Sequence, residues 1–365
     1  MRLLLADRSH DAALRKLMRE SSMPGRIRLA FAREPDFFHG LDVLGKRNQS
    51  VIATDRHGVI QGMGCRSIRP VFVHGEPTNL GYLSGLRIAP ESRHGSILAR
   101  GYAFLRELHA DGAAPAYLTT IVAGNRPVED LLTSGRAGLP AYLPFGRFVT
   151  CAICRGQRKR RRTSTSSFRV QRATDFHVDD LMQFLRTEGR GRQFFPVLAA
   201  SDLGSPYLRG LQHDNFYVAT AQGRLLGAVA VWDQSDFKQT VVTGYSTGLG
   251  IIRPLLSRLM TAAGFHPLPP PGAALRTRYL SFVRVVRDDP AILSALLEAI
   301  YADQPGSVEF LVLGFHERDP LQACVRQFLA IRYASTLYLA CWEDGLDFVR
   351  SLDDGRIPYL DPATL

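Results

Sequence analysis

Two stretches of the sequence are nearly alike, and they decide the fold: Tyr82-Leu83-Ser84-Gly85-Leu86-Arg87-Ile88 and Tyr279-Leu280-Ser281-Phe282-Val283-Arg284-Val285. Each stretch predicts a β-strand that leads into a helix. Further matches occur in the same order along the chain. Residues 51–64 resemble residues 217–227, and both predict a hairpin of two strands around a glycine turn. We infer that the chain contains an internal duplication.

The match continues downstream of these strands. Residues 117–122 and 310–313 each predict a strand, and each is followed by a helix with a proline, Pro127 or Pro320, in its first turn. The spacing from the tyrosine of the repeated strand to this proline is nearly the same in both copies. The second copy differs by an insertion, which we place at residues 234–274.

A chain of 365 residues fits two domains of ordinary size, which agrees with a duplication. We place the first domain at residues 1–154 and the second at residues 168–342, followed by a C-terminal extension over residues 343–365. The segment between them, residues 155–167, carries six positive charges and no apolar residue, so we expect a solvated linker.

Composition excludes several classes of protein. No run of about 18 apolar residues occurs, so we expect no membrane span. Five scattered cysteines favour a reducing, cytoplasmic location. The net charge of +11 lies largely in the linker and lacks interleaved aromatic residues, so we do not expect nucleic-acid binding. Cys151 and Cys154 lie on a predicted strand, where residues three apart face opposite sides, so we expect no metal site.

The order of elements in each copy is strand, helices, hairpin, strand, helix, strand, helix and final strands. With the hairpin at 51–64, the strand and loop at 82–98 and the strand and helix at 117–132, this order resembles the GCN5-related N-acetyltransferase (GNAT) fold in two tandem copies. The resemblance implies an α/β (α+β) protein in which each copy has a mixed, mostly antiparallel, twisted sheet flanked by helices.

The resemblance also implies a site for acetyl-CoA or another acyl-CoA in the first copy. Backbone groups of Leu86, Arg87 and Ile88 would contact the pantetheine arm. The pyrophosphate would lie on the free N–H groups of the next helix start, which form an anion site through the helix dipole. The loop residues are Arg93, His94, Gly95, Ser96, Ile97 and Leu98. Of the family pattern, only Arg93 stands in register, because Ser96 and Leu98 replace the usual small residues.

Three further residues are candidates for the reaction. Asn125 stands where the family uses an asparagine to contact the cofactor arm, and it suits equally well as the cap of the following helix. Leu132 stands where many members have a tyrosine that protonates the leaving thiolate, so we consider Tyr142 as the acid. Glu34 is the candidate base, although residues 33–38 also fit an ordinary helix start.

The second copy has Asp288 and Asp289 at the corresponding helix start, which fits N-capping rather than phosphate binding. We therefore expect an N-acyltransferase that uses its first copy, moves an acyl group from acyl-CoA to a small-molecule or peptide amine by direct attack in a ternary complex, and needs no metal. The alternatives are a non-catalytic binding or scaffold protein and an acyltransferase that uses acyl-carrier protein. The insertion carries an amphipathic segment, residues 249–263, which could cover the first copy's cleft or pair two chains as a homodimer.

Overall fold

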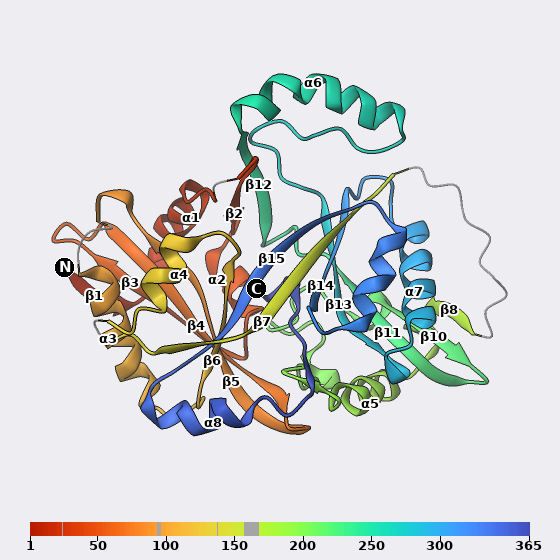
Figure 1. Cartoon of the computed structure of the whole chain (residues 1–365), viewed down its shortest axis with the longest axis horizontal. Helices are drawn as coiled ribbons and strands as arrows, with labels where there is room; N and C mark the ends of the chain where they lie inside the picture. Colours follow the sequence, from red (N-terminus) through yellow and green to blue (C-terminus); the bar gives the residue numbers. More distant parts are fainter. Residues whose placement is uncertain (24, 93–95, 137, 157–167) are drawn as a thin grey trace.

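A computed structural model describes residues 1–365 apart from residues 24, 93–95, 137 and 157–167 (Figure 1). The elements of the first half follow in chain order: β1 (Arg2–Leu5), α1 (Asp11–Glu20), β2 (Ile27–Ala32), α2 (Phe37–Asp42), β3 (Arg47–Thr54), β4 (Ile60–Val73), β5 (Glu76–Ile88), α3 (Ile97–His109), β6 (Tyr117–Val122), α4 (Arg126–Leu132) and β7 (Ala141–Cys154).

The second half repeats this order with additions. Its elements are β8 (Arg169–Arg172), α5 (Val178–Gly189), β9 (Arg192–Gln193), β10 (Phe216–Ala221), β11 (Arg224–Trp232), β12 (Gln239–Tyr245), α6 (Thr247–Ala262), β13 (Thr277–Val285), α7 (Pro290–Asp303), β14 (Phe310–His316), β15 (Ala330–Cys341), α8 (Leu346–Ser351) and β16 (Ile357–Pro358). The two predicted hairpins are β3–β4 and β10–β11, and the repeated stretches lie on β5 and β13.

Both halves contribute to a single sheet. In the described part of the chain it has twelve strands, in the order β1-β3-β4-β5-β6-β15-β7-β14-β13-β11-β10-β8. The pairs β5–β6 and β13–β14 are parallel, and the other neighbours are antiparallel. Helices pack against this sheet through buried residues such as Leu14 of α1, Leu181 of α5 and Leu296 of α7, each 0% exposed. The predicted fold class, a mixed and mostly antiparallel sheet flanked by helices, is confirmed.

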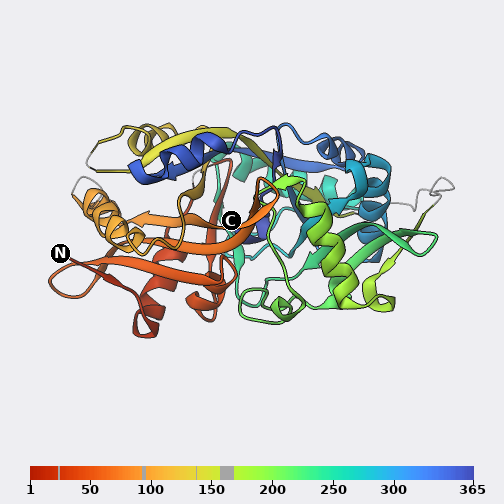
Figure 2. The same ribbon diagram turned by 90° about the horizontal axis from the view of Figure 1, so that it is seen from below.

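The two halves exchange their final strands. β7 pairs with β14 of the second half, whereas β15 of the second half pairs with β6. β7 and β15 also pair with each other along their length, from Ala141 opposite Cys341 to Ile153 opposite Ala330. Figure 1 shows the two long strands crossing the middle of the molecule, and Figure 2 shows the halves side by side. The boundaries at 154 and 168 stay predictions, because each half's sheet is completed by a strand of the other half.

The insertion at 234–274 connects the halves a second time. Its strand β12 pairs with β2 of the first half in a separate two-stranded sheet, from Gln239 opposite Ala32 to Tyr245 opposite Ile27. The helix α6 follows and lies at the top of the molecule in Figure 1, away from the large sheet. None of its residues is buried.

The C-terminal segment crosses back over both halves. Val349 and Leu352, in and just after α8, pack with Val71 and Leu80 of the first half. Tyr359 and Ala363 then join the large core cluster, which contains residues of both halves, whereas Leu360 stays in the cluster around Val71. This segment therefore contributes to the junction between the two halves.

Candidate functional site

The first half contains an opening between two neighbouring strands. β5 pairs with β6 only at Gly81 opposite Tyr117 and Tyr82 opposite Leu118. Beyond Tyr82 the two strands continue without pairing, so their ends diverge. Leu83 of β5 packs here with apolar and aromatic side chains from α3, α4 and β15, among them Tyr102 and Leu132.

β5 bulges at this opening. Ser84 lies opposite Cys65 and Arg87 lies opposite Met63, so Gly85 and Leu86 together face one residue of β4. Gly85 has a φ of 65°, a conformation that suits glycine because it lacks a Cβ. Within the described residues, neither Gly85 nor Leu86 pairs with β4 or β6. The bulge therefore turns backbone groups out of the sheet ladder at the point where the strands separate.

A surface pocket of about 600 Å³ lies beside this opening. It is formed between the start of α3 and the end of α4. Its lining residues are Leu98, Ala99, Asp130, Leu131, Ser134, Arg136 and Leu139. An exposed arginine and the N-terminal turn of a thirteen-residue helix thus share one pocket, an arrangement that suits a ligand with anionic groups.

The predicted cofactor residues fall into three groups. Leu86, Arg87 and Ile88 end β5 at the bulge. Ser96 stands just before α3 without a side-chain capping bond, Ile97 is buried and Leu98 lines the pocket. Arg93, His94 and Gly95 lie outside the described residues.

Asn125 is exposed at the start of α4, and its side chain makes no capping hydrogen bond. The capping role that its position allowed is therefore not realised by the side chain. Leu132 is 5% exposed and packs into the core between β5 and β6. The Tyr142 hydroxyl, from β7, shares a hydrogen bond with the Tyr102 hydroxyl of α3. Burial raises the pKa of Tyr142 well above its usual value, so this hydroxyl keeps its proton at neutral pH.

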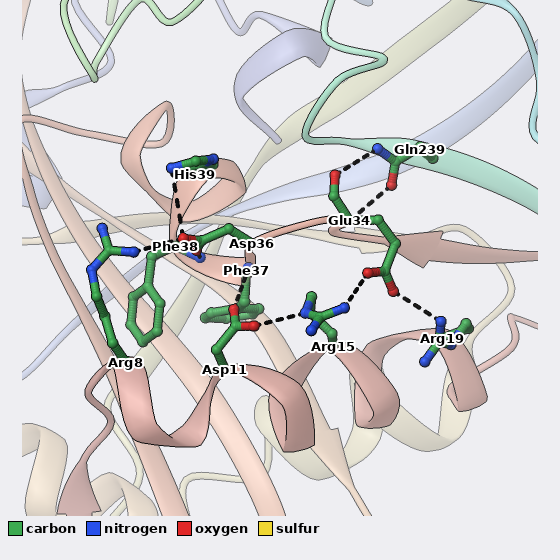
Figure 3. Close-up of polar contacts among 10 residues, drawn as sticks. All are labelled: Arg8, Asp11, Arg15, Arg19, Glu34, Asp36, Phe37, Phe38, His39 and Gln239. Atoms are coloured by element: carbon green, nitrogen blue, oxygen red, sulfur yellow. Dashed lines mark hydrogen bonds and ion pairs between the residues drawn. The ribbon is translucent and has the colours of Figure 1, made fainter.

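Glu34 follows β2 and is held from several sides (Figure 3). Its carboxylate accepts hydrogen bonds from Arg15 and Arg19 of α1, the latter at 2.9 Å. Its main-chain N–H and carbonyl bond the side-chain amide of Gln239 on β12 at 3.0 and 2.9 Å. Glu34 thus ties α1 and the insertion to the end of β2, and each of its carboxylate oxygens is paired with a guanidinium group.

The second half has the same bulge, but its own C-terminal segment fills it. Phe282, at the position of Gly85, has a φ of 54°, and its N–H donates to the Asp361 carboxylate at 3.1 Å. Ser281 Oγ donates to the same carboxylate at 3.0 Å, and the Val283 N–H donates to the Tyr359 hydroxyl at 3.2 Å. A bulge of this shape can therefore hold a carboxylate oxygen on a backbone N–H.

The helix start that follows this second bulge is also occupied. Asp289 caps α7 by accepting a hydrogen bond from the Ala291 N–H at 2.8 Å, which confirms the predicted N-cap. Asp288 instead forms ion pairs with Arg192 and Arg284 at 2.7 and 3.1 Å. Acidic side chains thus take the positions in the second half that an anionic ligand would need.

Known structures share this architecture. A GCN5-related N-acetyltransferase from Anabaena variabilis ATCC 29413 aligns over 93% of this chain and 72% of its own, with a TM-score of 0.51 and 9% sequence identity. The glucosamine N-acetyltransferase region of a fungal multi-domain GH3 β-N-acetylglucosaminidase aligns over 82% of this chain, with a TM-score of 0.53 and 12% identity. The chain has the GCN5-related N-acetyltransferase fold.

The sequence identities are low, so these similarities concern the fold alone. The aligned region makes up 34% of the fungal protein. No protein-family model and no curated protein sequence matches the chain. In the described part of this GNAT-fold chain, no helix is long and apolar enough to cross a membrane. The same residues contain no group of three or more His, Cys, Asp or Glu side chains placed to hold a metal.

Sequence reasoning missed two residues near the bulges of this GNAT fold. Asp361 carries no local signal, because only the fold brings residue 361 to residue 282. Arg33 precedes the predicted Glu34, and its side chain lies in the interior while that of Glu34 pairs on the surface of α1. An arginine at the end of an apolar strand was the one available hint.

Proposed function

We propose that the chain is an N-acyltransferase that moves an acyl group from acetyl-CoA or another acyl-CoA to an amine by direct attack in a ternary complex. The first half would carry the reaction. The observation that supports this most is the bulge at Gly85, which lies where β5 and β6 diverge and beside the pocket of α3 and α4. The acyl-CoA is a substrate here, and no metal takes part.

In this proposal the cofactor lies across the pocket. The pyrophosphate lies at the start of α3, beside Ser96, Ile97 and Leu98, with Arg136 in the lining of the pocket and Asn125 at the start of α4. Backbone groups at 86–88 bind the pantetheine arm as an added strand would. A backbone N–H of the bulge then polarises the thioester carbonyl, as the Phe282 N–H binds the Asp361 carboxylate in the second half.

The chemistry needs one new bond and one broken bond. The amine nitrogen attacks the thioester carbon, a C–N bond forms, and the C–S bond breaks. The amine gives up a proton, for which Glu34 is the candidate acceptor, and the thiolate takes a proton, for which Tyr142 is the candidate donor. The raised pKa of Tyr142 keeps that hydroxyl protonated at neutral pH, as an acid requires, and also makes it a weaker proton donor than an ordinary tyrosine.

Thermal-shift titration with acetyl-CoA and with a long-chain acyl-CoA tests this proposal, together with release of free thiol in the presence of amines. We expect acyl-CoA to raise the melting temperature of the wild type. Arg93→Glu and Arg136→Glu should each abolish this rise, because both place a negative charge where we expect the phosphates to bind. Arg258→Glu, on the exposed face of α6, is the matched control and should leave the shift unchanged. If neither compound changes the melting temperature, the protein does not bind acyl-CoA, and a non-catalytic function is favoured.

A further inference from the structure

Arg33 differs from the other buried arginines of the chain. Side chains of Arg66, Arg192 and Arg284 are buried and each forms an ion pair with an aspartate. Arg69 is buried within electrostatic range of Asp361. Arg33 is 8% exposed, yet no carboxylate of the described residues lies within ion-pair distance of it, and the residues outside that set include no Asp or Glu.

The hydrogen bonds of Arg33 leave most of its guanidinium unused. Among the described residues it makes one, from Nη1 to the carbonyl of its neighbour Ala32 at 3.0 Å. The side chain is nonetheless built into place. A Cβ added to Gly40 of α2 would lie 2.1 Å from Arg33 Cδ, so only glycine at this position leaves room for the arginine. Burial of a charge without an acidic partner costs several kcal/mol, and the fold tolerates this cost at Arg33.

The surroundings of Arg33 are positive and adjoin the bulge. Its guanidinium interacts electrostatically with Arg87 on β5, and with Cys65, Tyr82 and Tyr279. Burial lowers the pKa of Arg33 to about 10, and the like charge of Arg87 acts in the same direction. The Arg87 Nε is itself buried with no hydrogen-bond partner among the described residues. Arg33 therefore lies within electrostatic range of two further cations, Arg87 and the buried Lys238, and no aspartate or glutamate is among the groups that act on it.

Arg33 and Arg87 lie close to the proposed reaction centre and apart from the cofactor pocket. Cys65 lies opposite Ser84, and its Sγ is 3.3 Å from where a Cβ of Gly85 would be. Arg33 comes from the β2–α2 loop and packs against Gly40 of α2, and the Phe237 carbonyl of the insertion lies beside the same glycine; none of these residues lines the pocket of α3 and α4. A ligand at Arg33 would thus lie outside the pocket that we assign to the cofactor.

We propose that Arg33, with Arg87, binds a carboxylate carried by the acceptor, so that the substrate class is amines that also bear a carboxylate group. The inference rests on the proposed acyl transfer for the role of this ligand. A guanidinium binds a carboxylate through two parallel hydrogen bonds, and Arg33 has its Nε and Nη2 free for them. The bound carboxylate supplies the counter-charge that the fold itself does not.

Binding can be measured without catalysis. Full-length protein is titrated in thermal-shift and calorimetric assays with a panel of N-acetylated amino acids, which mimic products, and with the carboxamide of each. We expect at least one carboxylate to stabilise the protein while its carboxamide does not. Arg33→Gln should abolish this difference, and Arg28→Gln, an exposed arginine on β2, should keep it. The proposal is overturned if no carboxylate stabilises the protein more than its carboxamide does. It is also overturned if the difference between the two remains in Arg33→Gln.

The same variants need a control for correct folding. Because Arg33 has no acidic partner, Arg33→Gln without ligand should unfold at the same temperature as the wild type or higher. If it unfolds lower, Arg33→Lys serves instead, since it keeps the charge and loses the paired hydrogen bonds. We then expect part of the preference for carboxylates to remain, and full loss or full retention of that preference in Arg33→Lys would contradict the proposed geometry.

Acyl-transfer rates separate this inference from the proposed function. With acetyl-CoA as donor, Arg33→Gln should raise the KM of a carboxylate acceptor by about 10- to 100-fold and change kcat little, as expected for loss of a charged hydrogen bond. The KM of the matching carboxamide should stay the same. If acyl transfer occurs with equal KM for the carboxylate and the carboxamide acceptors, the inference is wrong and the proposed function is unaffected. Absence of both transfer and acetyl-CoA binding overturns the proposed function, while the titrations above still decide the carboxylate site.

A last experiment shows whether the carboxylate belongs to the acceptor or to the acyl donor. Succinyl-CoA and butyryl-CoA are compared as donors in the wild type and in Arg33→Gln. We expect the substitution to affect the two donors equally. Selective loss of succinyl transfer would show that the carboxylate belongs to the acyl group and would overturn the assignment to the acceptor.

Discussion

Ser84 and Ser281 stand at equivalent positions in the two halves, but their hydroxyl groups have different surroundings. Ser281 Oγ donates to the buried Asp361 carboxylate at 3.0 Å. Ser84 Oγ is buried with no hydrogen-bond partner among the described residues. A buried hydroxyl that lacks a partner loses its bonds to water on folding and gains nothing in return.

Alanine substitutions at these two serines should therefore have unequal effects. We expect Ser281→Ala to lower the free energy of unfolding by about 1 to 2 kcal/mol, because it leaves a buried carboxylate with one donor fewer. Ser84→Ala should change it by less than about 0.5 kcal/mol or raise it. Urea denaturation of both variants measures the difference, and equal losses would contradict the assignment of the two bulges.

The pair of Arg66 and Asp111 gives a prediction about pH. Arg66 is fully buried, and its hydrogen bonds lower the pKa of Asp111 to about 2. A carboxyl whose pKa is lower in the folded state stabilises the fold above its unfolded pKa, and this contribution is lost as pH falls toward 2. We expect Asp111→Asn to cost about 3 kcal/mol at pH 7 by leaving a buried charge unpaired.

The cost of Asp111→Asn relative to the wild type should shrink as the pH is lowered below about 4, because the wild-type carboxyl then takes up a proton in the unfolded state while it stays ionised in the fold down to about pH 2. Asp347→Asn is the control, since that side chain is 96% exposed in its pair with Arg350. It should change stability by less than about 0.5 kcal/mol at any pH. Denaturation curves across pH 3 to 7 distinguish the two, and a pH-independent cost at Asp111 would refute the ion-pair explanation.

At the scale of elements, α6 is the helix whose packing departs most from its pattern. The sequence predicted an amphipathic segment at 249–263, and a helix is present there. Its apolar side chains are nevertheless exposed, with Ile251 at 74% and Leu255 at 60%. The helix extends from β12 at the edge of the molecule, where the large sheet offers no surface to cover these side chains.

Substitutions on α6 should hence leave the fold intact. We expect Leu255→Ser to change the free energy of unfolding by less than about 0.5 kcal/mol, whereas Leu296→Ala, on the buried side of α7, should cost about 3 kcal/mol. Thermal or urea denaturation provides the comparison. The predicted homodimer stays untested, and sedimentation velocity of the same samples examines it: a change of mass with Leu255→Ser would indicate that α6 pairs two chains.

Local pattern was enough to predict most elements near the site but not their partners. The strand at 82–88, the helix from Ile97 and the cap at Asp289 follow from periodicity and from the chemistry of helix starts. The ion pairs that hold Glu34 could not be predicted in this way. They depend on the distance between α1 and the end of β2, which packing sets.

At the scale of the whole molecule, the exchange of β7 and β15 joins the halves. Each of these strands is paired on one side with its counterpart and on the other with the half to which it does not belong by sequence. The halves are therefore two units in sequence and one sheet in structure. A cut in the segment between them should not separate them, because the strands remain paired.

Expression of the parts tests this. We expect residues 1–156 alone to lack a cooperative unfolding transition, since β6 would have no β15 beside it. A chain cut between 156 and 168 through an inserted protease site should stay together in size-exclusion chromatography and keep about the same melting temperature. A first half that folds cooperatively by itself would show that the exchanged strand is dispensable.

The sequence by itself determined the repeat, the two hairpins, the strands at 82–88 and 279–285 and the contrast between a basic and an acidic helix start. These features depend on residues close together in the chain, whose periodicity and turn chemistry act locally. Only the tertiary structure decided the exchange of β7 with β15, the filling of the second bulge by Asp361 and the burial of Arg33 without an acid. These depend on which distant segments pack together, and the free energy that selects such contacts comes from the whole core rather than from any short stretch.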